Sequence, residues 1–157
     1  MKNRHASKAR SARQSGSMLL EALIAILVFS LGILTVIGIQ AASIKLAADA
    51  QLRTRAALLA NRLIGEMWAG GDTIAELETK FKTGGAAYDA WLNDVKDSAK
   101  GLPGVSNEEG TLPTVSVVTA SGTEEGRVRI ELFWRMPSMA AGEFHKYTVI
   151  SQISRNK

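Results

Sequence analysis

The sequence predicts an α+β protein in which a long N-terminal helix packs on a small antiparallel sheet, with short helices between them. Three observations support this fold class. The first is a charge-free apolar segment at residues 22–39, and the second is an apolar stripe at helical spacing between Leu52 and Met67. The third is a change from a helical period to strict alternation after about residue 113.

The segment Ala22–Ile39 is apolar almost throughout. Its 18 residues carry no charge, and its only other members are Ser30, Gly32, Thr35 and Gly38. As a helix the segment would span ~27 Å, close to the hydrocarbon thickness of a bilayer. A buried helix of a soluble core is the alternative, but the rest of the chain is too small to surround it. We therefore predict a membrane span.

The basic character of the chain is confined to its N-terminal tail. The net charge is +4 and the pI is about 9.6, but five of the 19 Lys and Arg fall within residues 1–16 and all 15 Asp and Glu come later. The positive-inside rule places this tail in the cytoplasm and the C-terminal part outside the membrane. A cleaved secretory signal is less well supported, because the apolar run is long and only Ala41-Ala42-Ser43 offers a weak site.

The helical pattern continues beyond the span. Five apolar residues recur at intervals of three or four and form one stripe: Leu52, Ala56, Leu59, Leu63 and Met67. The run Ala69-Gly70-Gly71 is a stop signal. We expect one helix from about Ser17 to Trp68, with two helices broken at residues 40–43 as the alternative.

Two short helices are expected next. Thr73 and Glu76 have the spacing of a capping box at the start of a helix over Thr73–Lys82. A second helix, Ala86–Ala99, presents one apolar stripe made of Tyr88, Trp91, Leu92, Val95 and Ala99.

Three strands then follow in sequence, at Thr114–Thr119, Arg127–Arg135 and Phe144–Ile153. Short, turn-rich connections indicate an antiparallel meander. Its apolar face, which should cover the helix stripe, is predicted to include Val128, Ile130, Leu132 and Trp134.

The residue types needed for catalysis are scarce. The chain has no Cys and two His, His5 and His145, the second of which we interpret as structural or solvated. Phosphate-binding and nucleophile-elbow motifs are absent. We therefore expect no enzyme activity, cofactor, metal or small-molecule substrate. The pairs Glu108-Glu109 and Glu124-Glu125 are interpreted as solvated turns. The residues Arg127, Arg129 and Arg135 are interpreted as the solvent-exposed face of the sheet. Since the excess of basic residues also belongs to the tail, we do not expect nucleic-acid binding.

The junction of tail and span carries a specific arrangement. A basic tail is followed by Gly16, by Glu21 five residues later, and by the apolar helix. This arrangement resembles the class III signal of type IV pilins and type II secretion pseudopilins. The resemblance implies that a prepilin peptidase cuts between Gly16 and Ser17 and that Ser17 is N-methylated, although the family commonly has Phe or Met at that position. It also implies that Glu21 pairs with a neighbouring subunit's amine and sets the register of the filament.

Later segments resemble the PilV-type minor pilins of type IV pili. They are Leu58–Met67, Ala90–Val95 with Leu102–Gly104, and Phe133–Arg135. The resemblance implies a pilin-like fold with a leader (1–16), a membrane and filament-core part (17–42) and an exported head (43–157). It also implies a minor pilin that primes pilus assembly with other minor pilins and the major pilin, at the tip, in pili that support adhesion and twitching motility.

Such a subunit would sit in the inner membrane with a cytoplasmic N-terminus and a periplasmic head before it enters the pilus. Three alternatives remain open at this point. They are a minor pseudopilin of a type II secretion system, a membrane-anchored periplasmic enzyme or binding protein, and an exported soluble binding protein cut near Ala42.

Overall fold

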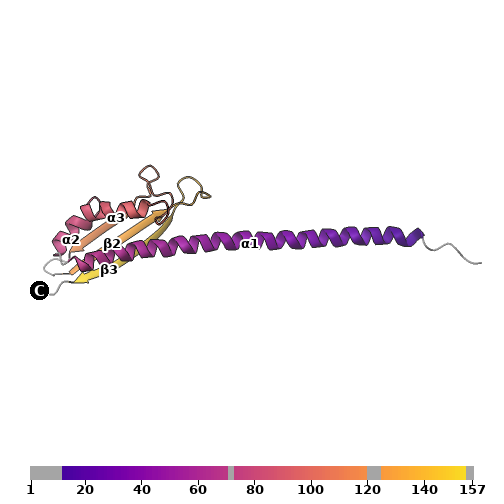
Figure 1. Ribbon diagram of the computed structural model, residues 1–157, viewed down its shortest axis with the longest axis horizontal. Helices are drawn as coiled ribbons and strands as arrows, with labels where there is room; N and C mark the ends of the chain where they lie inside the picture. Colours follow the sequence, from indigo (N-terminus) through magenta and orange to yellow (C-terminus); the bar gives the residue numbers. More distant parts are fainter. Residues whose placement is uncertain (1–11, 71–72, 120–124, 155–157) are drawn as a thin grey trace, which may run out of the picture. The chain divides into compact units, whose positions relative to one another are not determined.

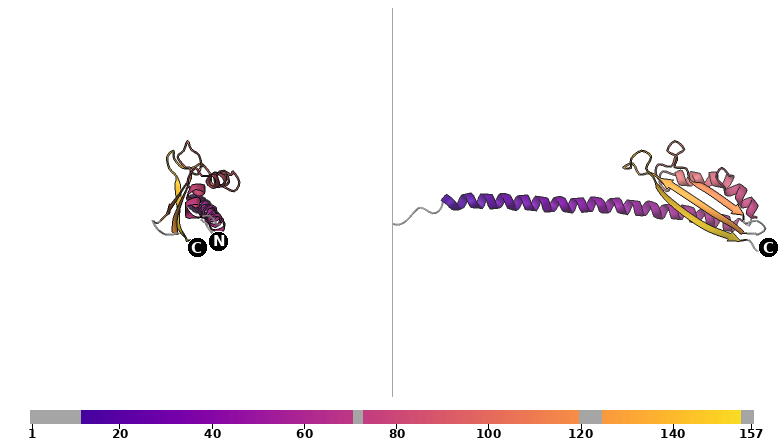
Figure 2. Two further views of the ribbon diagram at one scale, coloured as in Figure 1. Left: turned by 90° about the vertical axis from the view of Figure 1, so that its left-hand side faces the viewer. Right: turned by 180° about the vertical axis from the view of Figure 1, so that it is seen from behind.

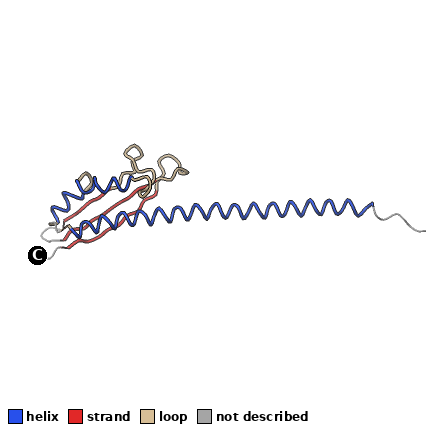
Figure 3. The backbone as a smooth tube through the Cα atoms, in the orientation of Figure 1, coloured by secondary structure: helices blue, strands red, loops and turns tan. Residues whose placement is uncertain are grey.

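The computed structural model describes residues 12–70, 73–119 and 125–154. Contacts divide the chain into two units, Met1–Ala47 and Ala48–Lys157. The elements follow in the order α1 (Ala12–Ala69), α2 (Ile74–Phe81), α3 (Ala86–Lys96), β1 (Thr114–Thr119), β2 (Glu125–Trp134) and β3 (His145–Ser154) (Figures 1 and 3). A long apolar N-terminal helix, short helices and a three-stranded antiparallel sheet are compatible with the predicted α+β class.

Helix α1 is continuous from Ala12 to Ala69 and therefore contributes to both units. This confirms the prediction of one helix, and a break at residues 40–43 does not occur. The helix begins earlier than the expected start near Ser17, because Ala12, Arg13 and Gln14 are good helix formers and no proline follows them. The expected tail residues 1–11 lie outside the described residues.

The second half of α1 contributes buried apolar side chains to the core of the second unit. Ala56, Leu59, Leu63 and Met67 of the predicted stripe are buried, and Leu52 is half-buried. On its outer side, Arg62 contacts Glu66 at 3.1 Å and Asp94 of α3 at 2.9 Å. The buried face of this segment is therefore the apolar stripe that its sequence period predicts.

Helix α2, Ile74–Phe81, starts with the predicted capping box. The Thr73 hydroxyl accepts the Glu76 N–H, and the Glu76 carboxylate accepts the Thr73 N–H at 2.8 Å. Two otherwise unpaired helix-end donors are satisfied in this way. Ile74, Leu77 and Phe81 are buried.

Helix α3, Ala86–Lys96, ends earlier than the expected Ala99. The Asp97 carboxylate accepts the backbone N–H groups of Ala99 and Lys100, at 2.9 and 2.7 Å, and turns the chain out of the helix. Hydrogen bonds from Lys100 and Ala99 hold the pKa of Asp97 below its ordinary value. As a result Ala99 is exposed and does not join the stripe, whereas Tyr88, Trp91 and Val95 are buried.

The sheet has the strand order β1-β2-β3, with β1 at Thr114–Thr119, β2 at Glu125–Trp134 and β3 at His145–Ser154. Both pairings are antiparallel, which confirms the meander. The bounds of β2 and β3 differ from the prediction by one or two residues. The predicted inner face of β2 is buried: Val128, Ile130, Leu132 and Trp134.

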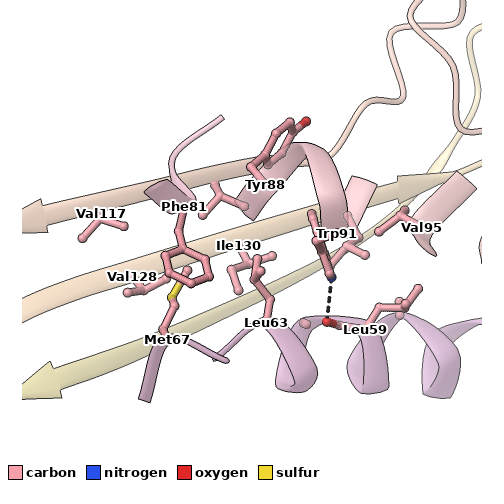
Figure 4. Packing of buried hydrophobic residues seen from close by; sticks show 14 of the residues in the cluster. Leu59, Leu63, Met67, Phe81, Tyr88, Trp91, Val95, Val117, Val128 and Ile130 are labelled. Carbon is pink, nitrogen blue, oxygen red and sulfur yellow. Dashed lines mark hydrogen bonds between the residues drawn. The ribbon is translucent and has the colours of Figure 1, made fainter. Parts of the chain in front are cut away.

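One side of the sheet carries the second half of α1 together with α3 (Figure 2). Two buried hydrogen bonds fix this packing. The Trp91 Nε1–H donates to the Leu59 carbonyl at 2.9 Å (Figure 4), and the Tyr88 hydroxyl donates to the Pro113 carbonyl at 2.7 Å. Burial raises the pKa of Tyr88. The second unit therefore has one core shared by helices and sheet.

Candidate functional site

The first unit presents an apolar helix surface that nothing in the described chain covers. Every side chain from Gly16 to Ala48 is exposed, including the large apolar ones between Met18 and Leu46. Burying one such side chain contributes about 1.5–3 kcal/mol, so this surface requires an apolar environment. The helix is long and apolar enough to cross a membrane.

The polar residues inside the span are satisfied within the helix. The Ser30 hydroxyl donates to the Ile26 carbonyl at 2.7 Å, and the Thr35 hydroxyl donates to the Leu31 carbonyl at 2.9 Å. These bonds lower the cost of placing a hydroxyl in hydrocarbon. The segment Ala22–Ile39 therefore suits either lipid or a packed bundle of helices.

The predicted processing residues all lie in α1. Gly16 and Ser17 are exposed, and a Cβ atom added to Gly16 would meet no atom within 4 Å. Glu21 follows Ser17 by four residues, so both side chains share one side of the helix. Glu21 is exposed, and no ion pair joins it to another described residue. With respect to the described residues, its carboxylate can therefore meet a group from outside the chain.

A histidine contact in the second unit was not foreseen. His145 Nε2 lies 3.3 Å from Asp49 Oδ1, and the His145 ring stacks on Trp134 with centroids 5.5 Å apart. Asp49 belongs to α1 and His145 begins β3. The two side chains are 28% and 30% exposed and lie in contact between α1 and the sheet, which favours the structural over the solvated interpretation of His145. No sequence spacing signals a pair this far apart.

The prediction that three arginines lie on the solvent-exposed face of the sheet is only partly confirmed. Arg127 and Arg129 are exposed on β2, but Arg135 lies beyond the strand and is half-buried. Its guanidinium contacts Glu109 at 2.9 Å and the Met139 carbonyl at 3.4 Å. The prediction was therefore wrong for Arg135.

Glu108 and Glu109 lie exposed in a turn as predicted, and Glu109 in addition pairs with Arg135. For the second acidic pair, the turn prediction was wrong for Glu125, because it begins strand β2 and accepts a bond from Gln152 of β3 at 2.8 Å. Glu124 lies outside the described residues.

No family model, curated protein or solved structure matches this chain. Within the described ranges, no group of three or more His, Cys, Asp or Glu side chains could hold a metal ion. The feature with the clearest functional chemistry is the bare apolar helix with Glu21 near its beginning. Such an arrangement can anchor a chain in lipid and can pack against similar helices.

Proposed function

We propose that this chain is a minor pilin of a type IV pilus, synthesised with a leader and held in the inner membrane by residues 17–42. The carrying observation is the uncovered apolar surface of α1, which begins directly after the Gly16–Glu21 arrangement. Lipid covers this surface before assembly, and neighbouring helices cover it in the filament. The head of residues 43–157 makes contacts with other pilins outside the membrane.

The position of Glu21 supports this function. A carboxylate inside an apolar span costs a few kcal/mol, about 2.5–3.5 at the centre of a bilayer. Cleavage after Gly16 creates a free amine at Ser17, and a neighbouring subunit's amine can neutralise Glu21. Two opposite charges that leave water as a hydrogen-bonded pair cost less than either charge alone. The pair therefore favours one axial position of a subunit relative to the next.

Cleavage between Gly16 and Ser17 requires local opening of α1, because both residues are helical. Residues 16–20, from Gly16 onward, are exposed, so opening on this side of the bond breaks no tertiary contact in the described chain. The cost is that of fraying a helix end, where the first four N–H groups lack intrahelical partners. A glycine at the cut also leaves a protease subsite unobstructed.

The test is the intact mass and N-terminal sequence of membrane-extracted protein, made with and without a prepilin peptidase. We expect a chain that begins at methylated Ser17 only when the peptidase is present. The Gly16→Val variant should stay uncut, because its side chain would block the subsite without disturbing the chain's own packing.

The matched control is Gly32→Val, the same change in the same helix at a position that also has no atom within 4 Å. It should be cut like the original chain. An uncut original chain would favour the anchored enzyme or binding protein, and a chain that starts near Ser43 would favour the soluble exported protein. Co-purification with secretion rather than pilus components would assign the pseudopilin alternative.

A further inference from the structure

The outer edge of β3 is an unused row of backbone hydrogen-bonding groups. β3 is ten residues long, and in the part of the chain that the structure describes it pairs with β2 alone. In an antiparallel pair, alternate residues direct their N–H and C=O groups toward the partner strand, and the others direct them away. The register of the sheet therefore determines which residues of β3 face outward.

The outward residues of β3 can be identified by starting from β1, at the opposite edge of the sheet. Val115 of β1 accepts the Thr83 N–H at 3.0 Å and donates its own N–H to the Thr83 hydroxyl at 2.9 Å, so its backbone groups face away from β2. Val115 pairs with Ile130, whose groups must then face β3. Ile130 pairs with Val149. Alternation leaves five residues with outward groups: Lys146, Thr148, Ile150, Gln152 and Ser154.

The two edges of the sheet are treated differently. Thr83 caps β1, whereas no backbone hydrogen bond to the outward groups of β3 occurs among the described residues. The β3 edge also lacks the usual protections: it has no proline, and its register with β2 runs without a bulge. An open edge of this kind is a template for another strand.

The one charged side chain on this edge is turned back onto the sheet. Lys146 Nζ lies 2.8 Å from Glu131 Oε1 and 5.6 Å from the centre of the Phe133 ring. It therefore does not extend over the edge to repel an incoming strand. Thr148, Gln152 and Ser154 are uncharged, and Ile150 is 54% exposed.

The outer face beside this edge carries charges of both signs. Arg127 and Arg129 lie on it between Glu125 and Glu131. Glu131 is held by Lys146 at 2.8 Å, and Arg129 reaches it only at 3.9 Å, which leaves both guanidinium groups able to bind a further carboxylate.

Arg129 pairs with Ile150 in register, and Arg127 pairs with Gln152. A hollow of about 500 Å³ is lined by these two arginines and by one acid, Glu125, which accepts a bond from Gln152 at 2.8 Å. A strand added to β3 would lie two strand spacings, or ~9.5 Å, from β2. An arginine and a glutamate side chain can meet across that gap.

We propose that β3 accepts an extended segment of another protein as a fourth strand, and that this segment carries acidic side chains on the face of Arg127 and Arg129. Backbone bonds to the outward groups would supply affinity, and the two arginines would select the partner's charge. The proposal stands independently of the proposed pilin function, because it uses only the second unit.

The first test uses three synthetic ten-residue peptides that share an alternating valine–threonine sequence. They differ at two positions whose side chains would lie on the face of Arg127 and Arg129, where they carry Glu, Gln or Lys. Amide exchange of the full isotope-labelled chain in detergent micelles is followed by NMR. We expect the Glu peptide to slow exchange at Thr148, Ile150 and Gln152, and not at Tyr147 or Val149, which already bond to β2. No slowing at these three amides with peptide at about 1 mM would overturn the proposal.

The variant Thr148→Pro removes one outward donor and leaves every bond to β2 in place, because proline is tolerated at an outward edge position. This variant should lower the affinity for the Glu peptide by about tenfold. Thr148→Ala, which keeps the N–H, should bind the Glu peptide with unchanged affinity. Unchanged binding by Thr148→Pro would contradict strand addition.

The variant Arg129→Gln keeps every backbone group and so remains informative even if the proline variant fails to fold. It should lower the affinity for the Glu peptide severalfold and leave the affinity for the Gln peptide unchanged. The matched control is Arg53→Gln, at an exposed arginine of α1. Equal losses for both peptides, or for both variants, would exclude charge selection by Arg129.

Discussion

At the scale of single residues, Glu21 has the environment that changes most during the proposed life of the chain. It is exposed on α1, next to the apolar segment Ala22–Ile39. Near a bilayer surface its carboxylate can reach water, but inside a bundle of helices it cannot. Its charge then needs a partner, because an unpaired buried charge is strongly destabilising.

We predict that Glu21→Gln leaves membrane insertion intact and lowers incorporation into pili at least tenfold, a free energy of about 1.4 kcal/mol. The glutamine amide cannot neutralise a neighbouring subunit's amine. The measurement is the ratio of this protein in sheared pili to that in membranes. Glu143→Gln, an exposed acid in the head, serves as control. Equal incorporation of the Glu21→Gln variant and the original chain would show that this carboxylate does not act in assembly.

At the scale of elements, the β2–β3 pairing includes an ion pair with a defined pH dependence. The Lys146 ammonium donates to Glu131, which also accepts a bond from the Thr114 hydroxyl. The hydrogen bond from Lys146 holds the pKa of Glu131 below its ordinary value. The pair therefore stabilises the fold above the ordinary glutamate pKa of about 4.3, and this contribution is lost as the pH falls through the lowered pKa.

We predict that Lys146→Met lowers the free energy of unfolding at pH 7 by up to about 1 kcal/mol, and that the difference from the original chain disappears in acid below the Glu131 pKa. Urea unfolding of the full chain in detergent at both pH values measures it. As a control, Lys96→Met, at an exposed lysine of α3, should leave the free energy of unfolding unchanged at both pH values. A difference that persists in acid would mean that Lys146 acts through packing on Phe133 and not through Glu131.

At the scale of the whole molecule, the first unit is long and apolar enough to cross a membrane. Its apolar side chains are uncovered, whereas the second unit buries its own core. The double variant Leu27→Lys, Leu34→Lys should abolish stable membrane insertion, because each lysine costs about 2.5–3.5 kcal/mol at the centre of a span.

Extraction of membranes at alkaline pH measures this effect, since only inserted chains stay with the lipid. Leu58→Lys places the same charge at a side chain of the second unit that is 65% exposed, and it should remain in the membrane fraction. If the double variant also remained there, the head rather than the apolar helix would hold the chain to the membrane.

Local patterns were enough to predict most elements. The stripe from Leu52 to Met67, the Thr73–Glu76 capping box and the alternation of β2 depend on residues a few positions apart, and all three occur in the structure. The C-terminal end of α3 was missed because a side chain, Asp97, and not a helix-breaking residue ends it.

The sequence by itself determined the uncovered apolar helix, the position of Glu21 at its beginning and the order of helices and strands, because these follow from composition and periodicity along the chain. Only the tertiary structure decided that Asp49 meets His145, that Arg135 meets Glu109 and that Thr83 caps β1 while β3 stays open. Each of these features joins residues from distant parts of the chain. Their contact depends on how the core brings the elements together, which no local pattern encodes.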